Sequence, residues 1–203
     1  MPNDPLFLTR RSFGAGLAAG AGFLAMALPV RALTVDQAKT LIDQVVAEVN
    51  AIISSGKSEK QMLASFETMF ATYADVPAIG RSALGPTART ASPAQLSAFS
   101  KAFQGYLSRK YGRRFREFIG GKIEVKDARP VKTYFEVVST AYLQGEAPFE
   151  LLWDVSDKSG RLLFFNLIIE GVNMLASERV EIQAMLDKAG GDIDKLIVAL
   201  NAT

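Results

Sequence analysis

The sequence contains no histidine and no cysteine among its 203 residues. Without histidine, the chain lacks the commonest general base, the commonest metal ligand and the usual activator of a serine nucleophile. It also lacks a P-loop and a G-x-G-x-x-G sequence, the glycine-rich segments that hold nucleotide phosphates. The absence of cysteine is compatible with an oxidising compartment. These absences argue against most metal-dependent, hydrolytic and nucleotide-dependent enzymes, and no cofactor or metal is expected.

The first 32 residues have the pattern of an export signal. Paired arginines at 10 and 11 precede Ser12-Phe13, an uncharged run covers 14–30, and small residues stand at Val30 and Ala32. The paired arginines resemble the twin-arginine type of signal. A permanent membrane anchor is the alternative, but the apolar run is shorter than the ~20 residues that a spanning helix needs. We therefore predict a cleaved signal over 1–32 and one domain over 33–203.

Positive charge is concentrated in this segment. Arg10, Arg11 and Arg31 lie there with only Asp4, out of 23 basic and 21 acidic residues in the chain. The remaining chain has as many basic as acidic residues, so its net charge is zero. A neutral domain gives no support to a nucleic-acid partner, and none is expected.

Helical patterns fill the first part of the remaining chain. Capping boxes, in which a hydroxyl and a Gln side chain satisfy each other's backbone donors, occur at Thr34–Gln37, Ser58–Gln61 and Ser92–Gln95. Apolar residues three and four positions apart follow each box, which predicts amphipathic helices. The third helix is expected to be long and to end at Gly120-Gly121. Residues 75–91, broken by prolines and glycines, are expected to be irregular.

Strand patterns begin at residue 122. The four predicted strands span 122–128, 131–143, 149–155 and 161–170. Asp157–Gly160 has the composition of a hairpin turn between the last two strands. Two short helices, about 175–188 and 192–200, are expected to close the chain. Helices followed by an antiparallel sheet and then by further helices indicate an α+β fold.

Apolar side chains are more numerous than one buried sheet face needs. The strand at 162–169 is apolar on both faces, whereas the strand before it alternates. An antiparallel sheet commonly leaves one face to water, so the second apolar face needs cover from helices or from a bound lipid. The long helix adds aromatic residues at Phe99, Phe103, Tyr106 and Tyr111. Such residues usually form ordinary core, so both a solid core and a ligand cavity stay open.

Five basic residues gather near the end of the long helix: Arg109, Lys110, Arg113, Arg114 and Arg116. Cations are favoured near a helix C-terminus by the helix dipole, which would make this a solvated helix end. The cluster is denser than dipole matching requires. Contact with lipid phosphates or with an acidic partner surface is therefore the second interpretation.

Two blocks of the sequence resemble one known family. Residues 92–99, continuing to Tyr111, are similar to the long-helix signature of MlaC-type proteins. These are the periplasmic substrate-binding components of the Mla phospholipid transport system, also described as toluene-tolerance proteins. The stretch from Trp153 to 166–174 is similar to the final hairpin of that family and its E-G-V-S-M element. Together the two blocks and their spacing extend the resemblance over roughly residues 34–200.

The resemblance implies a strongly curved antiparallel sheet of the nuclear-transport-factor-like class, wrapped by helices around a pocket for lipid tails. The head group would stay near the mouth of that pocket. The protein would be a periplasmic phospholipid carrier rather than an enzyme. Its partners would be a lipoprotein complex at the outer membrane and an MCE-domain ABC transporter complex at the inner membrane. Asn173 stands where the family usually has Ser.

On this interpretation, tail contacts come from the second helix, the aromatic long helix and the last two strands. The residues expected to bind the lipid are Phe70, Tyr73, Phe99, Phe103, Tyr106, Tyr111, Trp153, Val155, Phe165, Leu167, Ile169 and Met174. Contacts with the head group or with a partner are expected from Arg109, Arg113 and Arg114.

Two other functions are weighed against the carrier. An enzyme of the same curved-sheet fold would need a buried carboxyl with a raised pKa, such as Asp154 or Glu136, beside a tyrosine at the floor of a small pocket. A pure adaptor that binds only other proteins would have a filled core without a cavity.

Overall fold

The computed structural model of the chain describes residues 33–114 and 119–203, without the side chains of residues 113 and 114. The predicted export signal at 1–32 therefore lies outside the described residues. In the described part of the chain, no helix is both long and apolar enough to cross a bilayer.

The three longer helices begin where the capping boxes predict. They are α1 (Val35–Ile53), α2 (Glu59–Tyr73) and α4 (Pro93–Arg114). The hydroxyls of Thr34, Ser58 and Ser92 each accept a hydrogen bond from the backbone N–H of the Gln three residues later. Each Gln side chain in turn accepts from the backbone N–H of the capping residue. Local sequence alone therefore accounts for these three helix starts.

The prediction of an irregular segment at 75–91 is wrong. The chain forms α3 (Val76–Leu84) and a short 3-10 helix, η1 (Gly85–Arg89). Asp75 caps α3 by accepting from the N–H of Ala78 at 3.1 Å, and a proline is tolerated in the first turn. Gly80 lies where a Cβ would stand 3.2 Å from Cε1 of Phe99. This glycine therefore allows α3 to pack closely on α4 and does not end the helix.

The second half of the chain forms a five-stranded antiparallel sheet. Its strands are β1 (Lys122–Val131), β2 (Tyr134–Tyr142), β3 (Phe149–Ser156), β4 (Leu163–Ile169) and β5 (Val172–Asn173). The spatial order is the chain order, β1-β2-β3-β4-β5. The four predicted strands are present, but the predicted boundary between the first two is wrong. β1 continues to Val131, and a tight turn at Lys132 and Thr133 separates it from β2. The two-residue β5 was not predicted.

The sheet is curved, with bulges in two of its strand pairs. The register shifts between Val125 and Asp127 where β1 pairs with β2, and between Asp154 and Val155 where β3 pairs with β4. The predicted hairpin turn after β3 is present: the N–H of Gly160 donates to the carbonyl of Asp157 at 2.8 Å, with φ of +85° at this glycine. Bulges bend strands and increase their twist, which lets the sheet wrap around what it covers.

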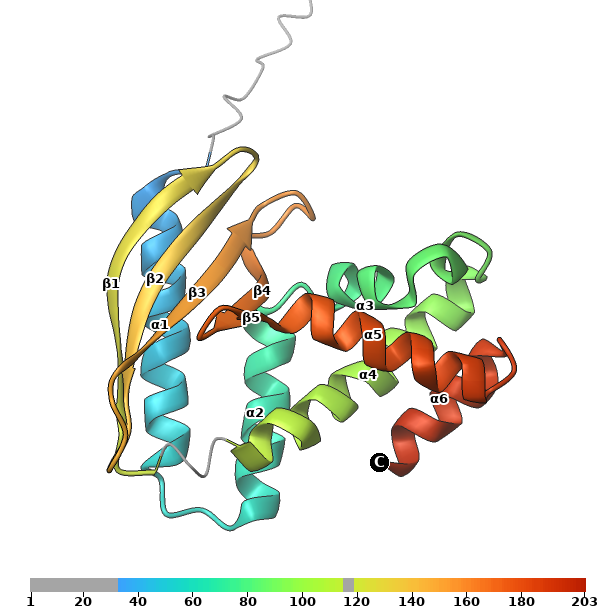
Figure 1. Ribbon diagram of the computed structural model, residues 1–203, viewed down its shortest axis with the longest axis horizontal. Helices are drawn as coiled ribbons and strands as arrows, with labels where there is room; N and C mark the ends of the chain where they lie inside the picture. Colours follow the sequence, from blue (N-terminus) through green and yellow to red (C-terminus); the bar gives the residue numbers. More distant parts are fainter. Residues whose placement is uncertain (1–32, 115–118) are drawn as a thin grey trace, which may run out of the picture. The chain divides into compact units, whose positions relative to one another are not determined.

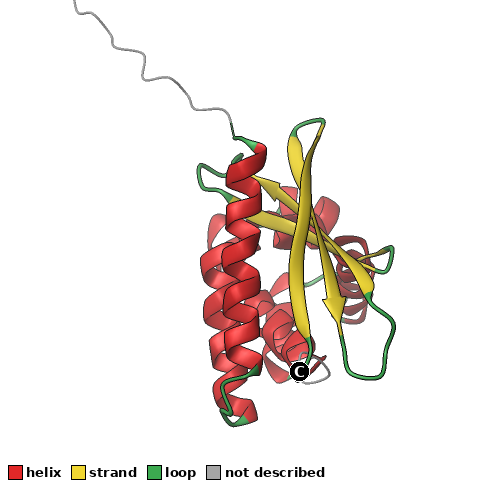
Figure 2. Cartoon of the chain, turned by 90° about the vertical axis from the view of Figure 1, so that its left-hand side faces the viewer, coloured by secondary structure: helices red, strands yellow, loops and turns green. Residues whose placement is uncertain are grey.

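Helices cover the concave side of the sheet and extend beyond it. Helix α1 packs along β1, β2 and β3 (Figure 1), and Figure 2 shows the long helices standing against one side of the sheet. Helices α5 (Met174–Lys188) and α6 (Ile193–Ala202) close the chain, with α5 against β4 and α3, and α6 against α4. The predicted α+β fold with a curved antiparallel sheet is confirmed.

Candidate functional site

A cavity of about 230 Å³ lies between the sheet and the helices. Helices α1 to α5, strands β1, β3 and β4 and the loop between β2 and β3 all contribute to its wall. The lining residues are Val49, Met69, Phe70, Ile79, Leu107, Tyr111, Ile123, Leu143, Glu146, Phe149, Leu151, Trp153, Phe164, Phe165, Asn166, Leu167, Ile169, Glu170, Met174, Leu175 and Glu178. Most of these side chains are aliphatic or aromatic, so the cavity is suited to an apolar ligand.

The volume of the cavity sets the size of ligand that fits. A water molecule occupies about 30 Å³ in the liquid, so the cavity has room for about eight groups of that size. A methylene group is of similar size, so the space matches a segment of one hydrocarbon chain, about eight methylenes long. A core packed solid would leave no such volume.

The structure brings seven of the predicted tail-contact residues to the cavity wall. They are Phe70, Tyr111, Trp153, Phe165, Leu167, Ile169 and Met174. Trp153 is held in place because its Nε1–H donates to the buried Oγ of Ser139 at 2.7 Å, and its ring meets that of Phe164 edge-on. Trp153 and Leu167 are paired across β3 and β4, so they present neighbouring side chains to the cavity.

The other five predicted residues lie away from the wall. Phe99, Phe103 and Tyr106 stack successively along α4, with ring centroids 5.4 and 6.0 Å apart. Phe99 and Phe103 are fully buried in the core, beside α3. Val155 is likewise buried in the core, and Tyr73 at the end of α2 is packed against the core without reaching the cavity. The aromatic face of α4 thus divides between helix packing at its start and the cavity at its end.

Sequence reasoning missed much of the wall. The missed apolar residues are buried wall residues: Val49, Met69, Ile79, Leu107 and Leu151. In the sequence, most of them are ordinary members of the apolar patterns that predict a helix or a strand. Periodicity shows which side of a helix is apolar, but it does not show whether that side faces a neighbour or a void. The polar wall residues Asn166 and Glu178 carried no sequence signal of this kind.

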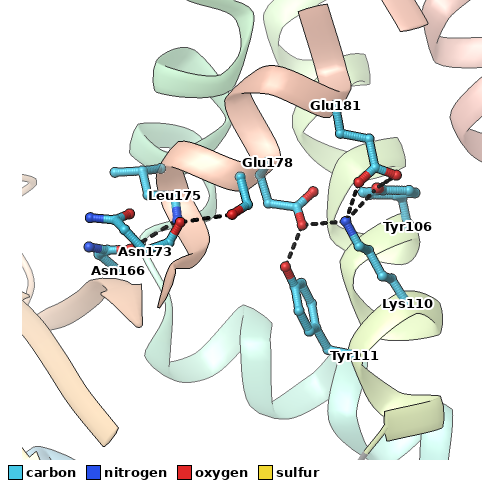
Figure 3. Close-up of polar contacts among 9 residues, drawn as sticks. Tyr106, Lys110, Tyr111, Asn166, Asn173, Leu175, Glu178 and Glu181 are labelled. Carbon is cyan, nitrogen blue, oxygen red and sulfur yellow. Dashed lines mark hydrogen bonds and ion pairs between the residues drawn. The ribbon is translucent and has the colours of Figure 1, made fainter. Parts of the chain in front are cut away.

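A polar cluster joins α4 to α5 (Figure 3), and two of its members, Tyr111 and Glu178, line the cavity. Lys110 donates to Oε1 of Glu178 at 2.6 Å and also bonds Glu181. The hydroxyl of Tyr111 donates to the same Oε1 of Glu178, and that of Tyr106 donates to Glu181 at 2.6 Å. Glu178 is only 2% exposed, so this cluster places a carboxylate inside an apolar wall.

The cluster shifts the titration of its members. Burial works against the charge of Lys110, but the hydrogen bonds to Glu178 and Glu181 outweigh it and raise the pKa of Lys110. Burial alone would raise the pKa of Glu181, yet the bonds from Lys110 and Tyr106 lower it. Burial and the bond to Glu181 raise the pKa of Tyr106 well above its usual value. Lys110 therefore stays protonated and Tyr106 stays neutral across the physiological range.

A second polar chain links the sheet to the start of α5. Nδ2 of Asn166 donates to Oδ2 of Asp154 at 2.9 Å, and its Oδ1 accepts the N–H of Leu175 at 3.0 Å. Burial is the main cause that raises the pKa of Asp154, and the nearby Glu136 adds to it. Asn166 lines the cavity, but Asp154 and Glu136 do not. The carboxyls named for an enzymatic site are therefore not at the floor of the cavity.

Of the three arginines expected to contact a head group or a partner, the structure describes the side chain of Arg109 alone. The guanidinium of Arg109 donates to the carbonyl of Leu200 at 2.7 Å, so this side chain ties α4 to the last turn of α6. The side chains of Arg113 and Arg114 lie outside the described residues. None of the described residues that line the cavity is basic. Within 33–114 and 119–203, no group of acidic side chains is arranged to hold a metal ion.

A curved antiparallel sheet closed by helices over a cavity lined mostly by apolar side chains defines the fold as α+β with an internal apolar cavity. The chain belongs to the MlaC family: the family model described as MlaC protein matches residues 40–202. Among solved structures, the chain is similar in fold to the phospholipid-binding protein from Ralstonia solanacearum in complex with a phospholipid. The two are 20% identical with a TM-score of 0.69, and the match covers 81% of this chain and 95% of the other.

Proposed function

We propose that the protein binds a phospholipid by enclosing acyl-chain hydrocarbon in the cavity, and that it carries this lipid through the periplasm. The apolar cavity of about 230 Å³ is the observation that carries the proposal. Membership of the MlaC family and the fold shared with a phospholipid-bound protein support it. Residues 33–203 are proposed as the lipid-binding domain, delivered by a twin-arginine-type signal at 1–32.

Energetics explain why such a carrier needs a cavity rather than catalytic groups. Exposing a methylene to water costs about 0.8 kcal/mol, so a chain of ~15 methylenes costs roughly 12 kcal/mol. Loss of the lipid into water is therefore negligible. Transfer from a bilayer into the cavity exchanges one apolar medium for another and is nearly neutral. The lipid accordingly leaves the carrier only where a membrane or a membrane complex receives it.

The complexes that receive and supply the lipid belong to the same proposal. Family resemblance points to a lipoprotein complex at the outer membrane and an MCE-domain ABC transporter complex at the inner membrane. An enzyme of this fold is less well supported, because Asp154 is buried away from the cavity wall and bonded to Asn166. A pure adaptor is less well supported because the interior is hollow.

Lipid binding in the cavity is tested by a larger side chain that takes up part of its volume. Leu167 lines the cavity on β4, whereas its neighbour Ile168 does not. We expect Leu167→Trp to reduce bound phospholipid per protein by about tenfold, because overpacking costs ~1–3 kcal/mol. Ile168→Trp is the matched control and should keep its lipid. Lipid extracted from the purified proteins is measured by mass spectrometry.

Two results would contradict the proposal. Protein purified under native conditions without any phospholipid would show that the cavity does not hold this ligand. Unchanged lipid content in Leu167→Trp, with the folded state verified by circular dichroism, would show that the lipid is bound elsewhere.

A further inference from the structure

We infer that the acidic part of the cavity wall selects a lipid whose head group donates hydrogen bonds, through an ammonium or a hydroxyl, and that Glu178 accepts this donor. The inference rests on the proposed lipid-binding function and adds to it a chemical class of head group.

The first observation is an unsatisfied carboxylate oxygen. Nζ of Lys110 and the hydroxyl of Tyr111 both donate to the same oxygen of Glu178, Oε1 (Figure 3). The other oxygen, Oε2, is buried and has no hydrogen-bond partner among the described residues. A buried acceptor without a donor is destabilising, and a donor supplied by a ligand removes that cost. Glu178 lines the cavity, so a bound molecule can supply it.

The second observation is the charge of the cavity wall. Glu146, Glu170 and Glu178 line it, and none of the described lining residues is a lysine or an arginine. Lys110 lies behind Glu178 and is shared with Glu181, so the three side chains together carry a net negative charge. A wall of this sign favours an ammonium or a hydroxyl hydrogen over a bare phosphate oxygen.

The third observation is that the acidic part of the cavity wall runs from the interior to the surface. Glu178 is 2% exposed, but its partners Lys110 and Glu181 have side chains that are 31% and 47% exposed. Glu146 and Glu170 are exposed at the rim. Two of the three acidic wall residues therefore lie where the apolar cavity meets water, and on this inference the head group is held between them and Glu178.

Three phospholipids with identical acyl chains and different head groups distinguish an ammonium donor from a hydroxyl donor. Phosphatidylethanolamine has an ammonium with N–H donors, and phosphatidylcholine has the same charges with every N–H replaced by methyl. Phosphatidylglycerol donates only through hydroxyls and carries a net negative charge. Delipidated protein is incubated with mixed vesicles containing equal amounts of the three, and the bound lipids are counted by native mass spectrometry.

We expect phosphatidylethanolamine to exceed phosphatidylcholine by about tenfold on the wild-type chain, the ratio that ~1.4 kcal/mol produces. In Glu178→Gln the ratio should fall toward one. The matched control is Glu181→Gln, which removes the other carboxylate partner of Lys110 without touching the cavity wall, and it should keep the wild-type ratio. If phosphatidylglycerol binds in the same amount as phosphatidylethanolamine, the donor is a hydroxyl. If phosphatidylglycerol binds much more weakly than phosphatidylethanolamine, the donor is the ammonium.

Equal uptake of phosphatidylethanolamine and phosphatidylcholine by the wild-type chain would overturn the inference while leaving lipid binding intact. A ratio that survives in Glu178→Gln would also overturn it. Failure to bind any of the three lipids would instead refute the proposed function. The wild-type comparison does not depend on whether the variants fold.

Discussion

At the scale of single residues, Asp154 is a buried carboxylate whose charge is costly to the fold. Its Oδ2 accepts from Asn166, but its Oδ1 is buried without a hydrogen-bond partner among the described residues. Burial raises the pKa of Asp154. A carboxyl with a higher pKa in the folded than in the unfolded chain lowers stability as the pH rises from the unfolded value, near 4, toward the folded one.

Replacing Asp154 with Asn therefore has a pH-dependent effect. The amide oxygen of Asp154→Asn can still accept from Asn166, while the buried charge is gone. We expect the variant to be more stable than the wild type at pH 7, with the difference shrinking as the pH falls toward 4. Urea unfolding between pH 4 and 7 measures this, with Asp157→Asn in the exposed β3–β4 turn as control. If Asp154→Asn is less stable than the wild type at pH 7, the conclusion that the charge of Asp154 destabilises the fold is wrong.

At the scale of secondary-structure elements, two asparagines hold the start of α5. Oδ1 of Asn173 accepts the N–H of Ala176 at 2.9 Å, and Oδ1 of Asn166 accepts that of Leu175. The first N–H groups of a helix have no partner within the helix, so these bonds fix where α5 begins. Met174, Leu175 and Glu178 line the cavity, so the same bonds position part of its wall.

Removing these caps should lower stability to different degrees. Asn173→Ala is expected to cost about 1 kcal/mol of unfolding free energy, the usual value of an N-cap, whereas Asn173→Ser should keep the cap. Asn166→Ala should cost more, about 2 kcal/mol or above, because it leaves both Asp154 and the N–H of Leu175 without a partner. Chemical denaturation gives these values. Equal effects of the two alanine variants would show that Asn166 does not join the sheet to α5.

Elements specified by neighbouring residues could be predicted from the sequence. The capping boxes before α1, α2 and α4 and the Asp157–Gly160 turn act within four residues, and each is found in the structure. Helix α3 could not be predicted, because Gly80 is explained by a contact with Phe99, which is distant in the sequence. Intrinsic propensity counts such a glycine as a helix breaker, and tertiary packing overrides it.

The candidate site was predictable only in part for a similar reason. The excess of apolar side chains on the last two strands, together with the family resemblance, pointed to Trp153, Leu167 and Ile169, and all three line the cavity. The aromatic residues of α4 gave one continuous apolar face, yet Phe99 and Phe103 fill the core and only the end of the helix reaches the cavity. Glu178 was missed because an acidic residue on a helix usually faces water.

At the scale of the whole molecule, a filled cavity should stabilise the fold. A ligand that binds only the folded state adds about 2.7 kcal/mol at a hundred times its dissociation constant. For a chain of this length that corresponds to a rise in Tm of about 5–10 °C. Differential scanning fluorimetry of delipidated and refilled protein measures the rise. Leu167→Trp should show little or none, and an unchanged Tm of the wild type on refilling would speak against binding in the interior.

The order of the strands leaves β1 and β5 at the two edges of the sheet. Strand β1 carries a bulge near Lys126 and a proline at 130, and β5 is two residues long. Irregular, charged and very short edges prevent strands of separate molecules from pairing. A protein with a hollow, apolar interior is thereby protected from aggregating through the edges of its sheet.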